Sequence, residues 1–101
     1  MRCLLSLLIL LSMPIFAESI NKEIGKSVYE HNCIVCHENG VAGAPKIGDT
    51  SDWKTRQEKK DLDALTASAI NGLNAMPAKG TCQTCTDDEI KAAIDYMMPS
   101  K

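Results

Sequence analysis

The stretch His31-Asn32-Cys33-Ile34-Val35-Cys36-His37 constrains this chain more than any other part of it. Two cysteines are separated by two residues, and a histidine follows the second cysteine directly. This order is typical of covalent haem attachment. Two thiols with this spacing add to the porphyrin vinyl groups, and the histidine then reaches the iron. The pattern predicts Cys33 and Cys36 as attachment residues and His37 as an axial metal ligand.

Two other kinds of site use cysteine pairs of the same spacing. A structural zinc module would join this pair to Cys82 and Cys85, but 45 residues (37–81) lie between the pairs, against roughly 12–20 in compact zinc modules. A thioredoxin-like dithiol needs a βαβ setting, and the chain has almost no strand pattern. Haem is the favoured interpretation, and zinc and thiol chemistry stay open as alternatives.

The first seventeen residues have the organisation of a secretory signal peptide. Arg2 precedes an uncharged run over 3–17, which ends at Ala17 before the polar Glu18. The run is shorter than the roughly 18 residues of a membrane span. We predict a signal peptide at 1–17 and one domain with a single haem at 18–101, with an uncleaved membrane anchor as the alternative. Export would place the protein in the periplasm, where oxidising conditions allow disulfides.

Composition supports a cofactor and argues against nucleic acid. The full chain has 11 basic and 13 acidic residues, with no basic run, so no nucleic-acid partner is expected. Without the first seventeen residues, the aromatic residues are Tyr29, Trp53 and Tyr96. So small a domain buries little apolar surface by itself and benefits from a large apolar plate such as a porphyrin.

The pattern of apolar residues predicts an all-α fold with three main helices around the haem. The first is expected over 21–32 with Asn21 as its N-cap, the second over 61–71, and the third after Thr86, which forms a capping box with Glu89. A short helix over 51–57 would be capped by Thr50 or Ser51. Gly25 interrupts the first helix, which indicates either a close crossing with another helix or a tolerated surface glycine.

Three further residues are candidate haem contacts. The irregular segment 38–50 is long enough to wrap one face of a haem, and the carbonyl of Pro45 is a candidate acceptor for the second ring nitrogen of His37. The indole of Trp53 and the guanidinium of Arg56 are candidate partners for the haem propionates. A plain turn is the alternative for Pro45, and a place in the core is the alternative for Trp53.

Met76 is the expected sixth ligand of the iron. It lies in the loop 73–80, and Pro77 stiffens the backbone directly after it. His31 is too close in sequence to the attachment residues to cross the ring, and Met97 and Met98 belong to the last helix, where methionine usually packs. A thioether ligand favours ferrous iron, and a saturated iron suits a carrier better than a catalyst.

These motifs together resemble the class I c-type cytochromes, and within them the cytochrome c5 group. The resemblance rests on the attachment motif, on the Met76 loop and on four further features: 43–49, Trp53, Asn71-Gly72 and the Cys82-x-x-Cys85 pair. It implies covalent haem at Cys33 and Cys36, axial ligation by His37 and Met76, a hydrogen bond from His37 to the Pro45 carbonyl and a Cys82–Cys85 disulfide. It also implies a close crossing of the first and last helices at Gly25 and Tyr96. One feature departs from the group: after the short helix that contains Trp53, where such sequences often turn at a glycine, this chain has Glu58-Lys59-Lys60.

The expected function is that of a periplasmic electron carrier, not an enzyme. One covalently bound haem c would carry single electrons between redox proteins such as a cytochrome reductase and a terminal oxidase, with only transient association with membrane complexes. The alternatives are a thiol-disulfide oxidoreductase that uses Cys82 and Cys85, and a structural zinc module.

Overall fold

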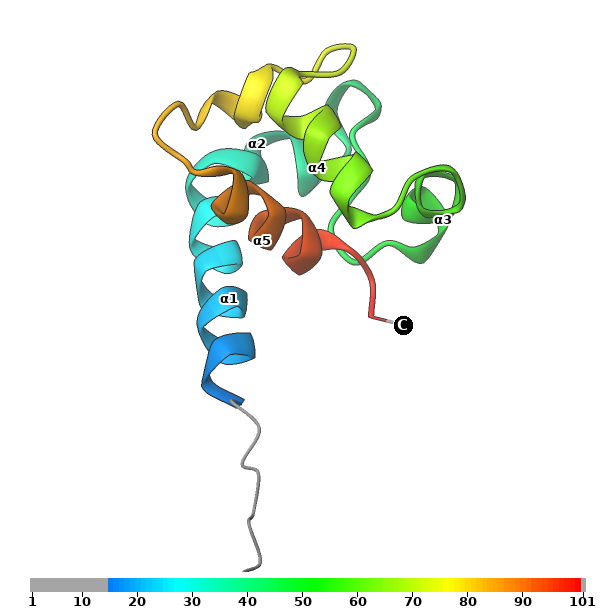
Figure 1. Cartoon of the computed structure of the whole chain (residues 1–101). Helices are drawn as coiled ribbons and strands as arrows, with labels where there is room; N and C mark the ends of the chain where they lie inside the picture. The colour runs from blue at the N-terminus through cyan, green and yellow to red at the C-terminus, as the bar shows by residue number, and fades with distance from the viewer. Residues whose placement is uncertain (1–14, 101) are drawn as a thin grey trace, which may run out of the picture.

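The structure, a computed structural model, describes residues 15–100, and that part is mostly helical, as the sequence predicts. The predicted signal peptide lies outside the described residues up to position 14, so its cleavage stays a prediction. In the described part the only strand-like pairing is one bridge between Leu73 and Met76. The helices, arranged as in Figure 1, are α1 (Ile15–Val28), η1 (Tyr29–Cys33), α2 (Ile34–His37), η2 (Val41–Gly43), α3 (Thr50–Lys59), α4 (Leu62–Asn71), η3 (Ala78–Thr81) and α5 (Asp87–Met97).

The first helix begins earlier than expected. α1 starts at Ile15, so Asn21 lies inside the helix and is not its N-cap. Residues 15–20 contain no glycine or proline to stop a helix, and Glu18 stabilises the positive end of the helix dipole in the first turn. After Val28 the backbone continues through the π-helical turn η1 into α2. The residues of the attachment motif therefore lie at the end of one nearly continuous helical segment, 15–37.

α1 packs against α5, and Gly25 lies at the crossing. A Cβ atom built on Gly25 would overlap the backbone carbonyl of Ala92 and would lie 3.1 Å from the Cβ of Tyr96. The two helices are thus too close for any side chain at position 25. This arrangement matches the close crossing that the resemblance implies and excludes a tolerated surface glycine.

α5 is the element that the sequence predicts best. The capping box is present, with the Thr86 hydroxyl accepting from the Glu89 N–H and the Glu89 carboxylate accepting from the Thr86 N–H. The apolar face predicted from the spacing is buried against α1 and α4, and its residues are Ile90, Ala93, Ile94 and Met97. α5 is therefore the centre of the small core (Figure 1).

α3 is longer than the short helix expected over 51–57, and its N-cap is Asp49 rather than Thr50 or Ser51. The Asp49 carboxylate accepts the backbone N–H of Asp52 at 2.9 Å. α3 spans ten residues, as α4 does, so the described fold has four longer helices where three main ones were expected. α3 ends at Lys59, the backbone of Lys60 is extended, and Asp61 is the N-cap of α4. The segment 58–60 therefore ends one helix and leads into the next without a glycine.

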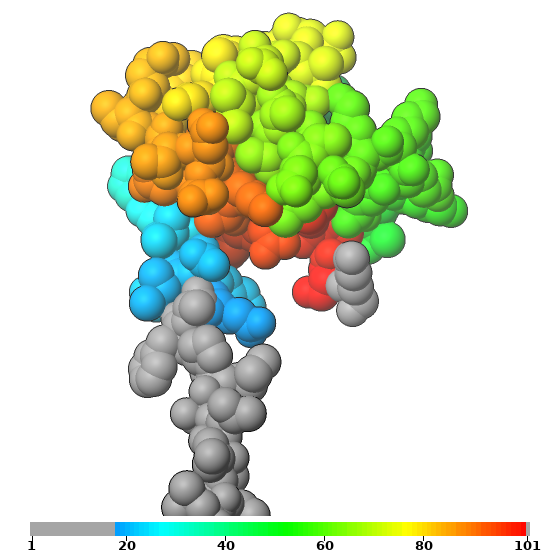
Figure 2. All heavy atoms as spheres, viewed as in Figure 1, coloured from blue at the N-terminus to red at the C-terminus, as the bar shows by residue number. Residues whose placement is uncertain are grey.

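Figure 2 shows α4 and the segments after it covering the upper part of the visible face, with α1 extending below them. None of the helices described between residues 15 and 100 has both the length and the apolar composition that crossing a membrane requires.

Candidate functional site: a cavity between the attachment motif and the Met76 loop

A cavity of about 320 Å³ lies between the attachment motif and the loop that carries Met76. Its volume is within the range of roughly 300–1,000 Å³ that is usual for ligand and cofactor pockets. Most of its lining is apolar. The motif contributes Asn32, Cys33, Val35, Cys36 and His37, segment 41–45 and Arg56 form another side, and segment 73–77 with Gly80 and Thr81 completes the lining.

His37 is held in one orientation at the wall formed by the motif. Its side chain is 7% exposed, and its Nδ1 donates to the carbonyl oxygen of Pro45 at 2.8 Å. This is the hydrogen bond that the sequence suggested. A donor at Nδ1 fixes the tautomer in which the Nε2 lone pair is available to a metal. His37 is therefore prepared to act as a ligand.

The Pro45 carbonyl is itself positioned through Lys46. The Lys46 carbonyl accepts the indole N–H of Trp53 at 3.0 Å, and the Lys46 N–H donates to the Asp52 carboxylate at 3.0 Å. The Lys46 ammonium also donates to Asp52, and this hydrogen bond is the main reason that the pKa of Asp52 is lowered. α3 therefore fixes the segment that orients His37.

The structure corrects the role expected for Trp53. Trp53 is 3% exposed, does not line the cavity, and uses its indole N–H on Lys46 rather than pointing it at a propionate. Its ring stacks beside that of His37, with centroids 6.5 Å apart. Trp53 is thus a core residue beside His37, which was the alternative left open.

Arg56 does line the cavity. Its guanidinium donates to the carbonyl oxygens of Asp52 at 2.6 Å and Gly43 at 3.1 Å. These two bonds leave part of its donor fork unused, because a guanidinium carries five N–H groups. Arg56 therefore stays a candidate contact for an anionic group at the cavity.

Met76 lines the cavity from the other loop. Leu73 and Met76 exchange two backbone hydrogen bonds, of 3.1 and 2.9 Å, which form a tight turn directly before Pro77. A Cβ atom built on Gly80 would lie 3.8 Å from the Met76 methyl carbon and 4.0 Å from the sulfur of Cys33. The thioether and the first motif cysteine therefore border the same space.

The other candidates for the sixth ligand lie elsewhere. His31 is exposed, and its Nδ1 bonds to the Ser27 carbonyl at 2.7 Å. Met97 is buried in the core, and the Met98 sulfur accepts from Gln57. None of these side chains lines the cavity.

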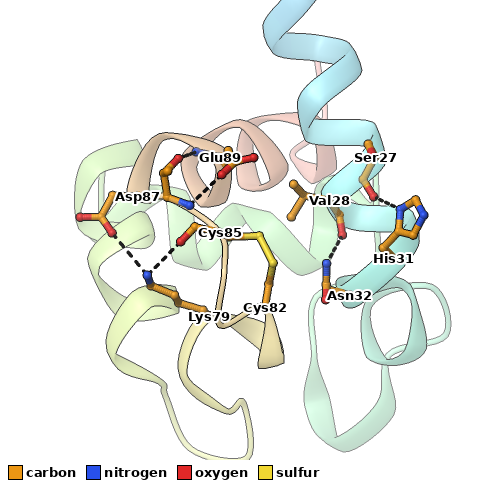
Figure 3. The surroundings of a disulfide bond; sticks show 10 residues. Ser27, Val28, His31, Asn32, Lys79, Cys82, Cys85, Asp87 and Glu89 are labelled. Atoms are coloured by element: carbon orange, nitrogen blue, oxygen red, sulfur yellow. Dashed lines mark hydrogen bonds and ion pairs between the residues drawn. A yellow bond between two sulfur atoms is a disulfide. The ribbon is translucent and has the colours of Figure 1, made fainter.

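A disulfide joins Cys82 to Cys85, as the resemblance implies, and both residues are buried (Figure 3). Since these sulfurs bond to each other, they cannot serve as thiolate ligands of a four-cysteine zinc site. Burial raises the pKa of Cys33 to about 11, with a smaller contribution from Cys36.

The contacts of two residues, Asp52 and Lys79, were not anticipated from sequence. Asp52 binds both the backbone and the side chain of Lys46, and Lys79 donates to the Cys85 carbonyl. A carboxylate in the first turn of α3 is a visible signal for Asp52, but it points to the helix dipole and not to Lys46.

Comparison with known proteins identifies the family. A family model described as "Cytochrome C oxidase, cbb3-type, subunit III" matches residues 21–97. Cytochrome c5 of Azotobacter vinelandii is 53% identical over 74 residues, which is 72% of this chain and 89% of that protein. This chain belongs to the cytochrome c5 group. It is a monohaem electron carrier with one covalently bound haem c.

Solved structures agree with this assignment. A mono-haem ferrocytochrome c from Shewanella putrefaciens is 48% identical, with a TM-score of 0.66 over 76% of this chain and 94% of that one. A chain from an electron transfer complex of nitrite reductase with cytochrome c is 38% identical, with a TM-score of 0.68 over 73% of this chain and 89% of that one.

The cavity of this cytochrome fits a haem by the chemistry of its donor set. Two thiols and an imidazole with its Nε2 lone pair available lie on one wall, and a thioether lies on the other. Glycine at position 80 keeps the space between Met76 and Cys33 open, because a side chain there would extend toward both. The residues present would thus offer thiols for attachment, an imidazole and a thioether as donors, and an apolar surround.

Proposed function

We propose that this cytochrome is a periplasmic carrier of single electrons, in which Cys33 and Cys36 hold the haem and His37 and Met76 ligate its iron. The observation that carries the proposal is that the imidazole and the thioether border one mainly apolar cavity. The haem supplies the one-electron couple.

The protein's own residues set the properties of that couple. The Pro45 carbonyl holds the His37 ring and strengthens it as a donor. The Met76 thioether would stabilise ferrous iron and raise the potential. With His37 and Met76 both bound to the iron, no position would be open to a substrate, which favours transport of electrons over catalysis.

Electron exchange would take place at the exposed rim of the cavity. Three aliphatic side chains line the cavity and are strongly exposed, namely Val35 at 74%, Val41 at 50% and Leu73 at 49%. Such a rim suits brief, weak docking of another redox protein. The related chain in an electron transfer complex with nitrite reductase supports this type of partner. A cytochrome reductase as donor and a terminal oxidase as acceptor are our proposed partners in the respiratory chain.

Replacement of Met76 by alanine tests the proposal. The haem should remain attached on a denaturing, reducing gel, because the bonds to Cys33 and Cys36 are covalent. The midpoint potential should fall by on the order of 0.1 V, a fraction of the roughly 0.8 V that axial ligands control. The ferrous protein should also bind carbon monoxide, and oxidation by respiratory membranes should slow.

Met98→Ala is the matched control, since Met98 lies outside the cavity. Its potential should equal that of the wild type. A lowered potential in Met98→Ala with no change in Met76→Ala would reassign the ligand, and loss of haem from the denatured wild-type chain would refute covalent attachment.

A further inference from the structure

Lys79 connects the Met76 loop to the start of α5. Its side chain is 26% exposed, which is low for a lysine. Its ammonium donates to the backbone carbonyl of Cys85 at 2.9 Å and lies 4.0 Å from the carboxylate of Asp87 (Figure 3). The lysine thus spans from the turn after Met76 to the disulfide loop directly before α5.

The backbone of Lys79 needs such an anchor. Its φ is +56°, in the left-handed region that side chains other than glycine seldom adopt. A residue in this region costs of order 1–3 kcal/mol and persists only where surrounding contacts hold it there. In this turn those contacts are the backbone bonds from Gly80 to Pro77 and from Cys82 to Lys79, both 3.0 Å, and the ammonium bond to Cys85.

The same turn borders the thioether. Gly80, the next residue, is the position whose Cβ would come within 3.8 Å of the Met76 methyl carbon. Met76 and Lys79 are separated only by Pro77 and Ala78. Any relaxation of the turn at Lys79 would therefore move the backbone that carries the sulfur.

We propose that Lys79 is a positioning residue that keeps the Met76 sulfur on the haem iron. The proposal rests on the ligation of iron by Met76 proposed above. The hydrogen bond to the Cys85 carbonyl is the contact that matters, because it is shorter and better sheltered than the ion pair. Asp87 is 74% exposed, and exposed pairs of this length contribute little.

Competition by imidazole for the ferric iron tests the proposal on the full, haem-loaded protein. Imidazole binds only when Met76 leaves, so its apparent affinity measures how firmly the sulfur is held. Lys79→Met retains an apolar stem and removes the donor. We expect it to raise the imidazole affinity about tenfold, which corresponds to about 1.4 kcal/mol. Lys79→Arg, which restores a cationic donor, should return the affinity to near the wild-type value.

Lys91→Met controls for the loss of a lysine and its ion pair at a site away from the cavity. Lys91 is paired with Asp63 at 2.8 Å, which links α5 to α4 away from the cavity. Because Asp63 is 80% exposed, loss of this pair should change the melting temperature little, and it should leave the imidazole affinity unchanged. Equal affinities in wild type and Lys79→Met, or equal increases in Lys79→Met and Lys91→Met, would refute the role of Lys79.

The outcome for the wild type distinguishes this proposal from the function it rests on. Ferric wild-type protein should show the far-red sulfur-to-iron charge-transfer band. Its absence would refute Met76 as the ligand and the Lys79 proposal with it. Its presence, with no effect of Lys79→Met, would refute the Lys79 proposal alone.

Discussion

Gly25→Ala tests the helix crossing on which the core depends, because the substitution has two opposing effects. Alanine is favoured over glycine in a helix interior by about 1 kcal/mol, so a loosely packed α1 would become more stable. In the structure, however, the new methyl group would overlap the Ala92 carbonyl and would lie 2.7 Å from the carbonyl carbon. These atoms belong to the backbone of α5 and cannot rotate away as a flexible side chain could.

The structure indicates which effect is larger. Overpacking a well-packed interior costs typically about 1–3 kcal/mol, and a rigid backbone neighbour places this site near the upper end. Subtracting the helix preference leaves a net loss of about 2 kcal/mol. At roughly 4–8 °C per kcal/mol for a domain of this size, the melting temperature should fall by about 8–16 °C.

Circular dichroism of the haem-loaded protein, followed during heating, measures this change. Ser27→Ala is the control, because Ser27 is on the exposed side of α1 and alanine there adds no contact. It should melt at or slightly above the wild-type temperature. If Gly25→Ala melted as high as the wild type, α1 could move away from α5 at no cost, and the close crossing would not be a constraint on the sequence.

Two further variants test the two sides of the cavity. The Cys82→Ser, Cys85→Ser double variant should keep its haem and its electron transfer. It should melt on the order of 10 °C lower, because a disulfide that closes so short a loop contributes about 2 kcal/mol. An unchanged melting temperature with lost activity would instead indicate a working redox dithiol. Asp52→Asn should be less stable than the wild type at neutral pH. Because the pKa of Asp52 is lowered in the folded protein, the stabilisation by this carboxylate is present above the ordinary carboxyl pKa and is lost as the pH falls through the lowered pKa. The melting temperatures of the two proteins should therefore converge in acid. A difference that stays constant with pH would contradict the stabilising pair of Asp52 with Lys46.

The parts of the fold that sequence predicts well are those set by local rules. The α5 cap at Thr86 depends on a hydroxyl and a carboxylate three residues apart, and both partners are visible in the sequence. The attachment motif is equally local. Met76 is singled out as the proposed sixth ligand because it precedes a proline in a loop, whereas Met97 follows the period of a helix.

The errors arose where several residues could serve the same purpose. Asp49, Thr50 and Ser51 are all good N-caps in succession, and only the hydrogen bond to Asp52 selects Asp49. Trp53 offered an N–H that a propionate or a carbonyl could accept. The choice depended on where segment 45–47 passes, which is a tertiary fact with no local signal.

Hydrogen bonds near the two ends of α5 fix both walls of the cavity. On the motif side, the Gly48 N–H donates to the Met97 carbonyl at the end of α5 at 2.7 Å, while the neighbouring Ile47 N–H donates to the carbonyl of His37 at 2.8 Å. On the Met76 side, Lys79 reaches the Cys85 carbonyl before the start of α5. The separation of His37 and Met76, the two ligands proposed above, is therefore set through α5 and the residues that flank it, and neither side chain belongs to that helix. With the ligation proposed above, a carrier would gain from this arrangement, because iron that kept the same two ligands in both oxidation states would need little rearrangement when an electron arrives or leaves.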